Sequence, residues 1–234
     1  MPPQPKKRDF QKELDGIIQQ LKEQTGQGKK KPSLLLHACC APCSSYVIEY
    51  LSSIFDITIY YYNPNIHPQT EYERRLAELK KFLTLFPLAV QNSVHLVVAD
   101  YDPKDYFTAT NVAKEPELQT EAEKGERCRR CYEFRMRRAY TYACLQGFDW
   151  FTTTLSISPH KDADKINTIG ETLQAVQHLQ KLPDTAKETR YLPANFKKQG
   201  GFLRSTKLSA EYGLWRQDYC GCVYSKQNNA PADI

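Results

Sequence analysis

The sequence predicts an α/β fold in which a mostly parallel sheet is flanked by helices. Two observations support this prediction: apolar runs with the length of buried strands alternate with helical patterns, and the chain of 234 residues is long enough for one such domain. We expect an N-terminal helix and basic linker over residues 1–32, the main domain over residues 33–225 and a C-terminal tail over residues 226–234.

The order of the elements follows from hydrophobic spacing along the chain. Leucine and isoleucine recur at helical spacing between Leu14 and Leu21, whereas the continuous apolar run at residues 34–38 has the length of a buried strand. Further strands are expected at residues 54–62, 94–99, 149–155 and 191–196. Helices are expected at residues 10–23, after a cap at Ser44 or Ser45, and at residues 71–86, 128–145, 162–179 and 208–216, with a loop or irregular helix at 108–126.

Composition narrows the functional class. The net charge of +5 is a mild basic excess, compatible with binding nucleic acid. No apolar run approaches the roughly 20 residues of a membrane span, and the N-terminus lacks the apolar core of a signal peptide. We therefore expect a cytoplasmic protein with no membrane partner. In that compartment, the eight cysteines indicate metal or redox chemistry rather than structural disulfides.

The strongest chemical signal is a group of three cysteines, Cys39, Cys40 and Cys43, between the first strand and the next helix. In open α/β sheets, this turn faces the ligand crevice at the carboxyl ends of the strands. Cys128 and Cys131 lie at the start of a later helix and share one of its faces. Four thiolates are the usual ligands of a [4Fe–4S] cluster, which we favour over tetrathiolate zinc or buried structural thiols.

A second sulfur motif, Cys220-Gly221-Cys222, has a different character. One intervening residue makes a small, strained disulfide ring, and glycine supplies the backbone freedom to close it. Strained disulfides are easily reduced, which suits a two-electron relay, and a pair of extra metal ligands is the alternative. Cys144 and His37 lie within apolar patterns and are expected in the core.

Two polar segments are candidate substrate sites. Residues 158–165 follow a predicted strand, where catalytic loops lie, although a charged helix cap would have the same composition. Residues 196–207 interleave aromatic and basic side chains and can stack bases and hold phosphates, with a solvated loop as the alternative. The phosphate-binding candidates are Lys197, Lys198, Arg204 and Lys207.

In these motifs the chain resembles the cobalamin-independent epoxyqueuosine reductase family, QueH, over about residues 34–225. Each motif alone is a weak signal, but their shared order is specific. The motifs are Leu-His-Ala-Cys-Cys-Ala-Pro-Cys from Leu36, Tyr-Asn-Pro-Asn-Ile-His-Pro from Tyr62, Glu-Lys-Gly-Glu-Arg-Cys-Arg-Arg-Cys from Glu123, Phe-Thr-Thr-Thr-Leu from Phe151, Ser-Pro-His-Lys-Asp from Ser158, and Glu-Tyr-Gly-Leu-Trp-Arg-Gln-Asp-Tyr-Cys-Gly-Cys-Val-Tyr-Ser from Glu211.

The resemblance implies the last step of queuosine biosynthesis, the two-electron removal of the epoxide oxygen from epoxyqueuosine in the tRNA anticodon loop. It implies a fold similar to the adenine-nucleotide hydrolase-like (HUP or PP-loop-like) three-layer sandwich. The implied partners are tRNA and an unidentified electron donor. The implied cofactor is a [4Fe–4S] cluster, with room for an additional iron and no cobalamin. The implied ligands are Cys39, Cys40, Cys128 and Cys131, beside a redox-active Cys220–Cys222 pair.

The proton donor to the departing oxygen is expected in the polar segment after the predicted strand at 149–155. Asp162 is our first candidate for this role, ahead of Asp164 and His160. Two other functions compete with the reductase. A sulfonucleotide reductase also pairs Cys-Cys with Cys-x-x-Cys around a cluster but gives no reason for Cys220-Gly221-Cys222. A non-catalytic iron–sulfur or zinc module that binds tRNA would use the metal and the basic surface alone.

Overall fold

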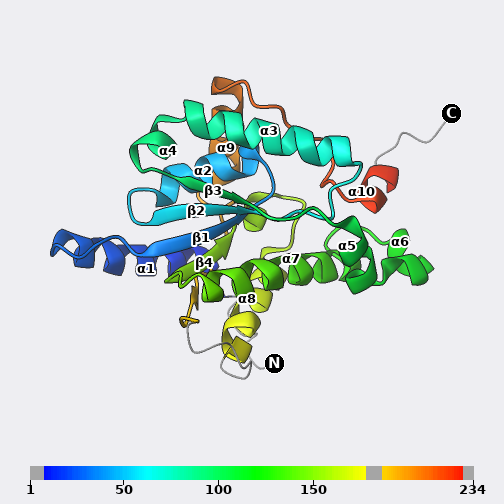
Figure 1. Cartoon of the computed structure of the whole chain (residues 1–234), viewed down its shortest axis with the longest axis horizontal. Coiled ribbons are helices and arrows are strands. Elements are labelled where there is room, and N and C mark those ends of the chain that lie inside the picture. Colours follow the sequence, from blue (N-terminus) through cyan, green and yellow to red (C-terminus); the bar gives the residue numbers. More distant parts are fainter. Residues whose placement is uncertain (1–7, 178–185, 229–234) are drawn as a thin grey trace, which may run out of the picture.

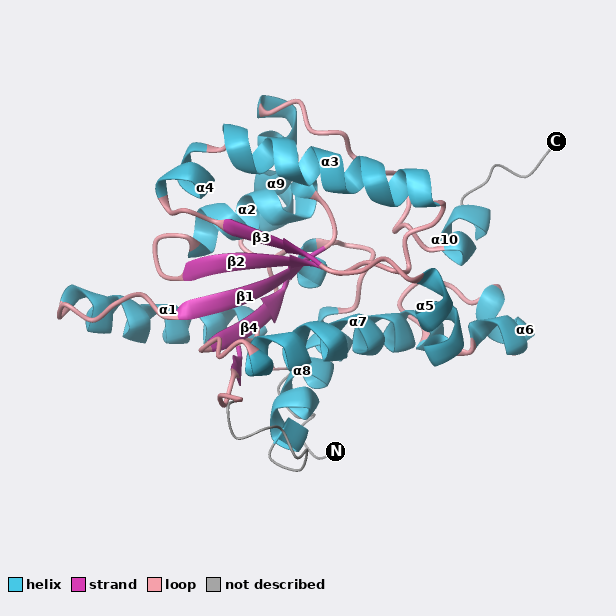
Figure 2. Cartoon of the chain, in the orientation of Figure 1, coloured by secondary structure: helices cyan, strands magenta, loops and turns pink. Residues whose placement is uncertain are grey.

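The centre of the fold is a sheet of five parallel strands, seen in a computed structural model that describes residues 8–177 and 186–228 (Figure 1). The strand order is β3-β2-β1-β4-β5, so that β1 lies in the middle. Because every pair is parallel, all the carboxyl ends meet at one edge (Figure 2). The strands are β1 (Ser33–Ala38), β2 (Asp56–Tyr61), β3 (His95–Val98), β4 (Trp150–Thr153) and β5 (Arg190–Tyr191).

Helices cover both faces of this sheet, which confirms the predicted three-layer α/β class (Figure 2). One layer contains α2 (Ala41–Leu51), α3 (Gln69–Leu85), α4 (Pro87–Gln91) and α9 (Gly201–Glu211). The other contains α7 (Glu126–Leu145) and α8 (Ala163–Gln177). Beyond the carboxyl edge lie α5 (Pro103–Thr110), the short 3-10 helix η1 (Val112–Lys114), α6 (Pro116–Gln119) and α10 (Val223–Asn228). A second 3-10 helix, η2 (Thr154–Ile157), follows β4, and none of the described helices has an apolar stretch that could cross a bilayer.

Alternation along β1 separates the two halves of the core. Leu34 and Leu36 pack into the cluster formed with α2 and α3, whereas Leu35 packs with α7 and α8. This follows from the two-residue period of a strand. His37 continues on the α7 face, where its Nδ1 lies 2.8 Å from Thr153 Oγ1. Burial, together with the positive charge of Arg135, lowers the pKa of His37 to about 3, so it is a neutral core residue, as predicted.

The N-terminal helix α1 (Phe10–Gly26) is part of the main core. It begins after Asp9, whose carboxylate accepts hydrogen bonds from the backbone N–H groups of Gln11 and Lys12. Leu14 is fully buried in the cluster that contains β1 and α2. Arg8 also donates to Glu171 of α8 over 2.9 Å.

Two element boundaries differ from the sequence prediction. Helix α2 begins at Ala41 with Cys40 at the N-cap position, and not after Ser44 or Ser45. Pro42 favours this earlier start, because proline is well accommodated in a first helical turn. Helix α9 spans Gly201–Glu211 and not residues 208–216, so the second part of the aromatic and basic segment at 196–207 is helical.

The last strand also differs, because β5 spans only Arg190–Tyr191 and not residues 191–196, whereas the other predicted elements are close to the observed ones. The stretch at 108–126 contains the end of α5, η1 and α6, in agreement with an irregular helical segment. The predicted end of a helix at residue 179 and the last part of the expected C-terminal tail, 229–234, lie outside the described residues.

The packing of α1 can be tested through Leu14. We expect Leu14→Ala to lower the free energy of unfolding by about 3 kcal/mol, because it leaves a cavity between α1 and the sheet. Gln20→Ala, on the exposed face of the same helix, should change it by less than about 0.5 kcal/mol. Urea denaturation followed by circular dichroism measures both. Equal effects of the two variants would show that α1 does not contribute to the core.

Candidate metal and redox site

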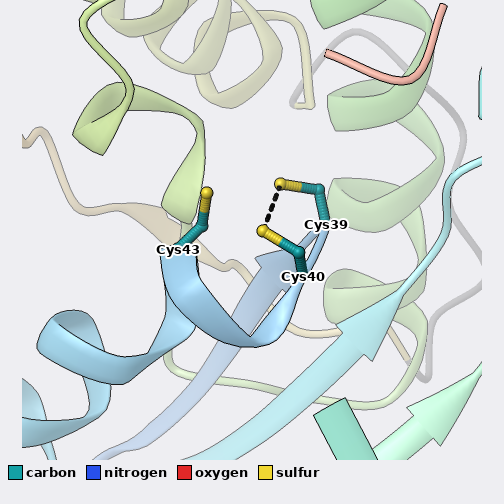
Figure 3. Close-up of side chains that lie close together, drawn as sticks. All are labelled: Cys39, Cys40 and Cys43. Atoms are coloured by element: carbon teal, nitrogen blue, oxygen red, sulfur yellow. Dashed lines mark hydrogen bonds between the residues drawn. The ribbon is translucent and has the colours of Figure 1, made fainter. Parts of the chain in front are cut away.

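Three thiols meet where the middle strand of the sheet ends. Cys39 follows β1, Cys40 occupies the N-cap position of α2, and Cys43 lies in the first turn of that helix. Their sulfur atoms all lie within 4.8 Å of one another, and 3.7 Å separates the Sγ atoms of Cys39 and Cys40 (Figure 3). The first turn of α2 brings Cys43 back towards the pair. This buried group could bind a metal ion or a cluster.

The other predicted cysteines line a second cavity, which we call the cysteine cavity. Cys128 and Cys131, from the first turns of α7, line it together with Cys220 and Cys222. Among the described residues, only the group of Cys39, Cys40 and Cys43 has ligand atoms close enough together to hold one metal. The four predicted cluster ligands are therefore divided between two neighbouring groups of thiols.

Buried positive charge surrounds these thiols. Arg75, Arg127 and Arg135 are the largest fully buried side chains, whereas no aspartate or glutamate is buried among the described residues. The Nε of Arg135 and the Nη2 of Arg127 are buried without a hydrogen-bond partner. A buried charge is stable only when it is paired.

Thiolates can supply the missing negative charge. Cys131 precedes Arg135 by one helical turn, and electrostatic coupling links Arg135 to both Cys131 and Cys39. On the other side, Arg75 pairs with Glu71 over 2.7 Å and is also coupled to Cys40 and Cys39. The donor chemistry and the surrounding cations therefore fit an anionic metal–thiolate group.

Arg75 also fixes the turn that contains Cys220 and Cys222. Its Nη1 donates to the carbonyl of Cys220 over 3.1 Å, and its Nη2 donates to the carbonyl of Tyr219 over 3.2 Å. Gly221 has φ +104, and an added Cβ would lie 2.9 Å from Ile66 Cγ1. Only glycine fits this left-handed position without strain. The turn is thus held against the cysteine cavity with both thiols free.

In each group of thiols, one cysteine has a lowered pKa. The Cys222 thiol donates to Cys220 and, with the positive charge of Lys161, lowers the pKa of Cys220 to about 5 despite burial. The neighbouring thiols of Cys40 and Cys43 lower the pKa of Cys39 in the same way. A thiolate is the form that binds metal and attacks electrophiles, so both groups are prepared for such chemistry.

An open pocket of about 250 Å³ leads to the sulfurs from outside. Cys43 and Cys220 lie in its wall, and the guanidinium of Arg216 covers the Phe202 ring at 5.6 Å from its centroid. The 3-10 helix η2 and the loop that follows it form another side. This position, at the carboxyl edge of the parallel strands, is where the sequence predicts the ligand crevice.

None of the five predicted substrate residues lines this pocket, and most of them already have other partners. Asp162 caps α8, because its Oδ1 accepts from the backbone N–H groups of Asp164 and Lys165. Lys197 Nζ donates to the Lys161 carbonyl over 2.7 Å. Arg204 donates to Glu49 over 2.8 Å. Lys198 and Lys207 are exposed.

Sequence reasoning gave no role to Arg75, Arg135, Glu123 or Lys161, although all four lie at the site. A signal existed for Arg135, because it follows Cys131 by four residues and so lies on the same face of a helix. Glu123 and Lys161 belong to motifs that the chain shares with the QueH family. Their position between the two cavities, however, depends on segments far apart in the chain.

The fold and the site together define a class: an α/β protein with thiols at the carboxyl edge of its sheet, arranged for metal binding or redox chemistry. The comparison with known families then gives the particular one. The family model Epoxyqueuosine reductase QueH matches residues 34–228, and the chain belongs to this family.

Similar proteins cover most of the chain. It is 40% identical to the epoxyqueuosine reductase QueH of Streptococcus pyogenes serotype M1 over 90% of this chain and 77% of that protein. It is 36% identical to the protein of the same name from Staphylococcus epidermidis over 90% of this chain and 83% of the relative. It is 35% identical to that of Haemophilus influenzae over 96% of this chain and 83% of the relative.

The acidity of Cys220 can be tested in reduced, metal-free protein. Alkylation by iodoacetamide should persist down to about pH 5, because the thiolate is the reactive form above the pKa of Cys220. Cys222→Ala removes the hydrogen-bond donor and should move the midpoint up towards the ordinary thiol value of about 8.5. Peptide mass spectrometry gives the modified fraction, with buried Cys144 as the unreactive reference. The same midpoint in both proteins would exclude this hydrogen bond as the cause.

Proposed function

We propose that the protein is an epoxyqueuosine reductase, which removes the epoxide oxygen from epoxyqueuosine in the tRNA anticodon loop and completes queuosine biosynthesis. Such an oxidoreductase adds two electrons and two protons and releases the oxygen as water. The observation that supports this function most is the meeting of two groups of thiols beside an open pocket, in a chain that belongs to the QueH family.

The proposed cofactor is a [4Fe–4S] cluster held by Cys39, Cys40, Cys128 and Cys131, with an additional iron nearby and no cobalamin. The all-thiol donor set and the buried arginines support this assignment. When bound, the cluster would supply electrons, and an additional iron would supply Lewis-acid polarisation of the epoxide oxygen. Such a group would also give Arg127 and Arg135 the negative charge that they otherwise lack.

Cys220 and Cys222 are the proposed two-electron relay. Both are free thiols that line the cysteine cavity, and Cys220 also lines the open pocket. Their oxidation to a disulfide releases two electrons, the number that the epoxide requires. An external electron donor would then restore the dithiol.

The RNA is proposed to lie across the mouth of the pocket. Lys197, Lys198, Arg204 and Lys207 are our candidates for its phosphates. The exposed Lys198 and Lys207 are free to make such contacts at once, whereas Arg204 would have to leave Glu49. A tRNA substrate implies a cytoplasmic location. Asp162 stays a sequence-based candidate for the proton donor, with its Oδ1 already engaged at the start of α8.

The cluster assignment can be tested by metal analysis. Anaerobically purified protein should be brown and carry at least about four irons with matching sulfide. Cys128→Ala should lose most of this iron, whereas Cys144→Ala, in the core of the same helix, should retain it. A colourless parent protein that binds one zinc, even after reconstitution with iron and sulfide, would exclude the cluster.

The reaction itself can be tested anaerobically with dithionite as reductant. We expect conversion of epoxyqueuosine to queuosine in tRNA without added cobalamin, detected by nucleoside mass spectrometry as the loss of one oxygen. Cys220→Ser should retain iron and lose turnover, because the relay does not hold the cluster. Loss of iron in proportion to activity would identify Cys220 as a ligand. Reduction of adenylyl sulfate by a cluster-loaded protein that leaves the epoxide intact would instead identify a sulfonucleotide reductase.

A further inference from the structure

Four residues line both the open pocket and the cysteine cavity: Glu123, His160, Lys161 and Cys220. They form the wall between the two spaces. A substrate that enters the pocket and reacts at the sulfurs must therefore meet these side chains first. One of the four, Cys220, carries electrons, and the other three can carry protons.

The reaction needs a proton that the dithiol does not hold. Removing an epoxide oxygen as water consumes two electrons and two protons. Cys220 and Cys222 supply both electrons when they form a disulfide, but the hydrogen bond from Cys222 favours the thiolate form of Cys220. Only Cys222 then brings a proton, so a second donor must lie in the wall of the pocket.

Glu123 is the residue best placed to be this donor. Among the described residues, no other carboxyl group lines both cavities, and Asp218 lines the open pocket alone. Lys161 is a poor donor: burial disfavours its charge, but the thiolates of Cys39 and Cys220 outweigh that effect and raise its pKa. Its ammonium is better described as a fixed positive charge in the wall between the two cavities.

The surroundings of Glu123 give it a route to solvent. Its Oε1 accepts a hydrogen bond from Ser225 Oγ over 2.9 Å, which holds the carboxyl group in place. Its Oε2 lies 3.6 Å from His160 Nδ1, and the His160 side chain is 73% exposed. One carboxyl oxygen is thus fixed inside the protein, and the other lies beside an imidazole that is exposed to water.

We propose that Glu123 donates a proton to the departing epoxide oxygen and that His160 restores this proton from solvent. The inference rests on the proposed reductase function. In the complete reaction, both C–O bonds break and a C=C bond forms. The oxygen leaves as water with one proton from Glu123 and one from Cys222, while the Cys220 thiolate and Cys222 become a disulfide.

This role has a defined pH dependence. A carboxylic acid donates only in its protonated form, so the single-turnover rate should fall as the pH rises. The groups that face Glu123 are His160 and Lys161 from the loop after β4, Cys220 and Ser225 from the C-terminal segment, and Arg127 and Cys128 from the start of α7.

The test is anaerobic single turnover on epoxyqueuosine-containing tRNA between pH 5 and pH 9, after loading with iron and sulfide. Glu123→Gln should lower the rate roughly 100-fold, as expected for loss of a general acid, and remove the fall at high pH. His160→Ala should also be slow and regain rate with added imidazole, because the position is exposed. Imidazole should not rescue Glu123→Gln, and the exposed Glu117→Gln should behave as the parent protein.

Two further measurements separate catalysis from other roles. Iron content, cluster absorption and tRNA affinity of Glu123→Gln should equal those of the parent protein. Parent-like rates in Glu123→Gln, or a loss of rate that follows a loss of iron, would overturn the proposal. So would loss of the high-pH fall in Asp162→Asn but not in Glu123→Gln. Turnover by the parent protein tests the reductase function separately, because an inactive parent would refute that function whatever Glu123 does.

Discussion

The site depends on the balance of buried charge. Arg75, Arg127 and Arg135 are fully buried; Arg75 pairs with the largely buried Glu71 over 2.7 Å, but no buried carboxylate among the described residues answers the other two. An ion removed from water loses several kcal/mol of solvation unless a partner restores it. The thiols around these arginines are the groups that can become negative, and so the arginines and the cysteines stabilise one another. A metal–thiolate group would complete this balance, because it stays anionic where isolated thiols would protonate.

The same charges explain how distant parts of the chain come together. Arg75 extends from α3 to the carbonyls of Tyr219 and Cys220, near the C-terminal end of the described residues. The backbone N–H of His67 donates to the Gly221 carbonyl over 2.8 Å and holds the turn from the other side. These contacts place Cys220 beside a cavity lined by cysteines of α7. Backbone hydrogen bonds, rather than a disulfide, hold the turn of Cys220 and Cys222 against the sheet edge in the described part of the chain.

The parallel sheet gives the site its place and its two sides. All five carboxyl ends meet at one edge, so the turns after β1 and β4 necessarily lie near each other. The turn after β1 supplies thiols, and the loop after β4 supplies His160 and Lys161. In the proposed reaction, electrons come from the sulfur side and protons from the solvent side. The wall between the cavities is where the two would meet.

Much of this protein was determined by local sequence. The apolar run before Cys39 and the alternation of strand and helix patterns predict a parallel sheet with thiols at its carboxyl edge. These patterns can be recognised locally, because the side-chain periods of a strand and of a helix depend only on residues near one another in the chain. The core positions of His37 and Cys144 followed in the same way. Only the tertiary structure decided which thiols lie together and which polar groups are already engaged. Cys43 joins Cys39 and Cys40 because α2 begins at Ala41, and Arg204 pairs with Glu49 because α9 packs on α2. Contacts between residues so far apart in the chain depend on packing, which no local pattern contains.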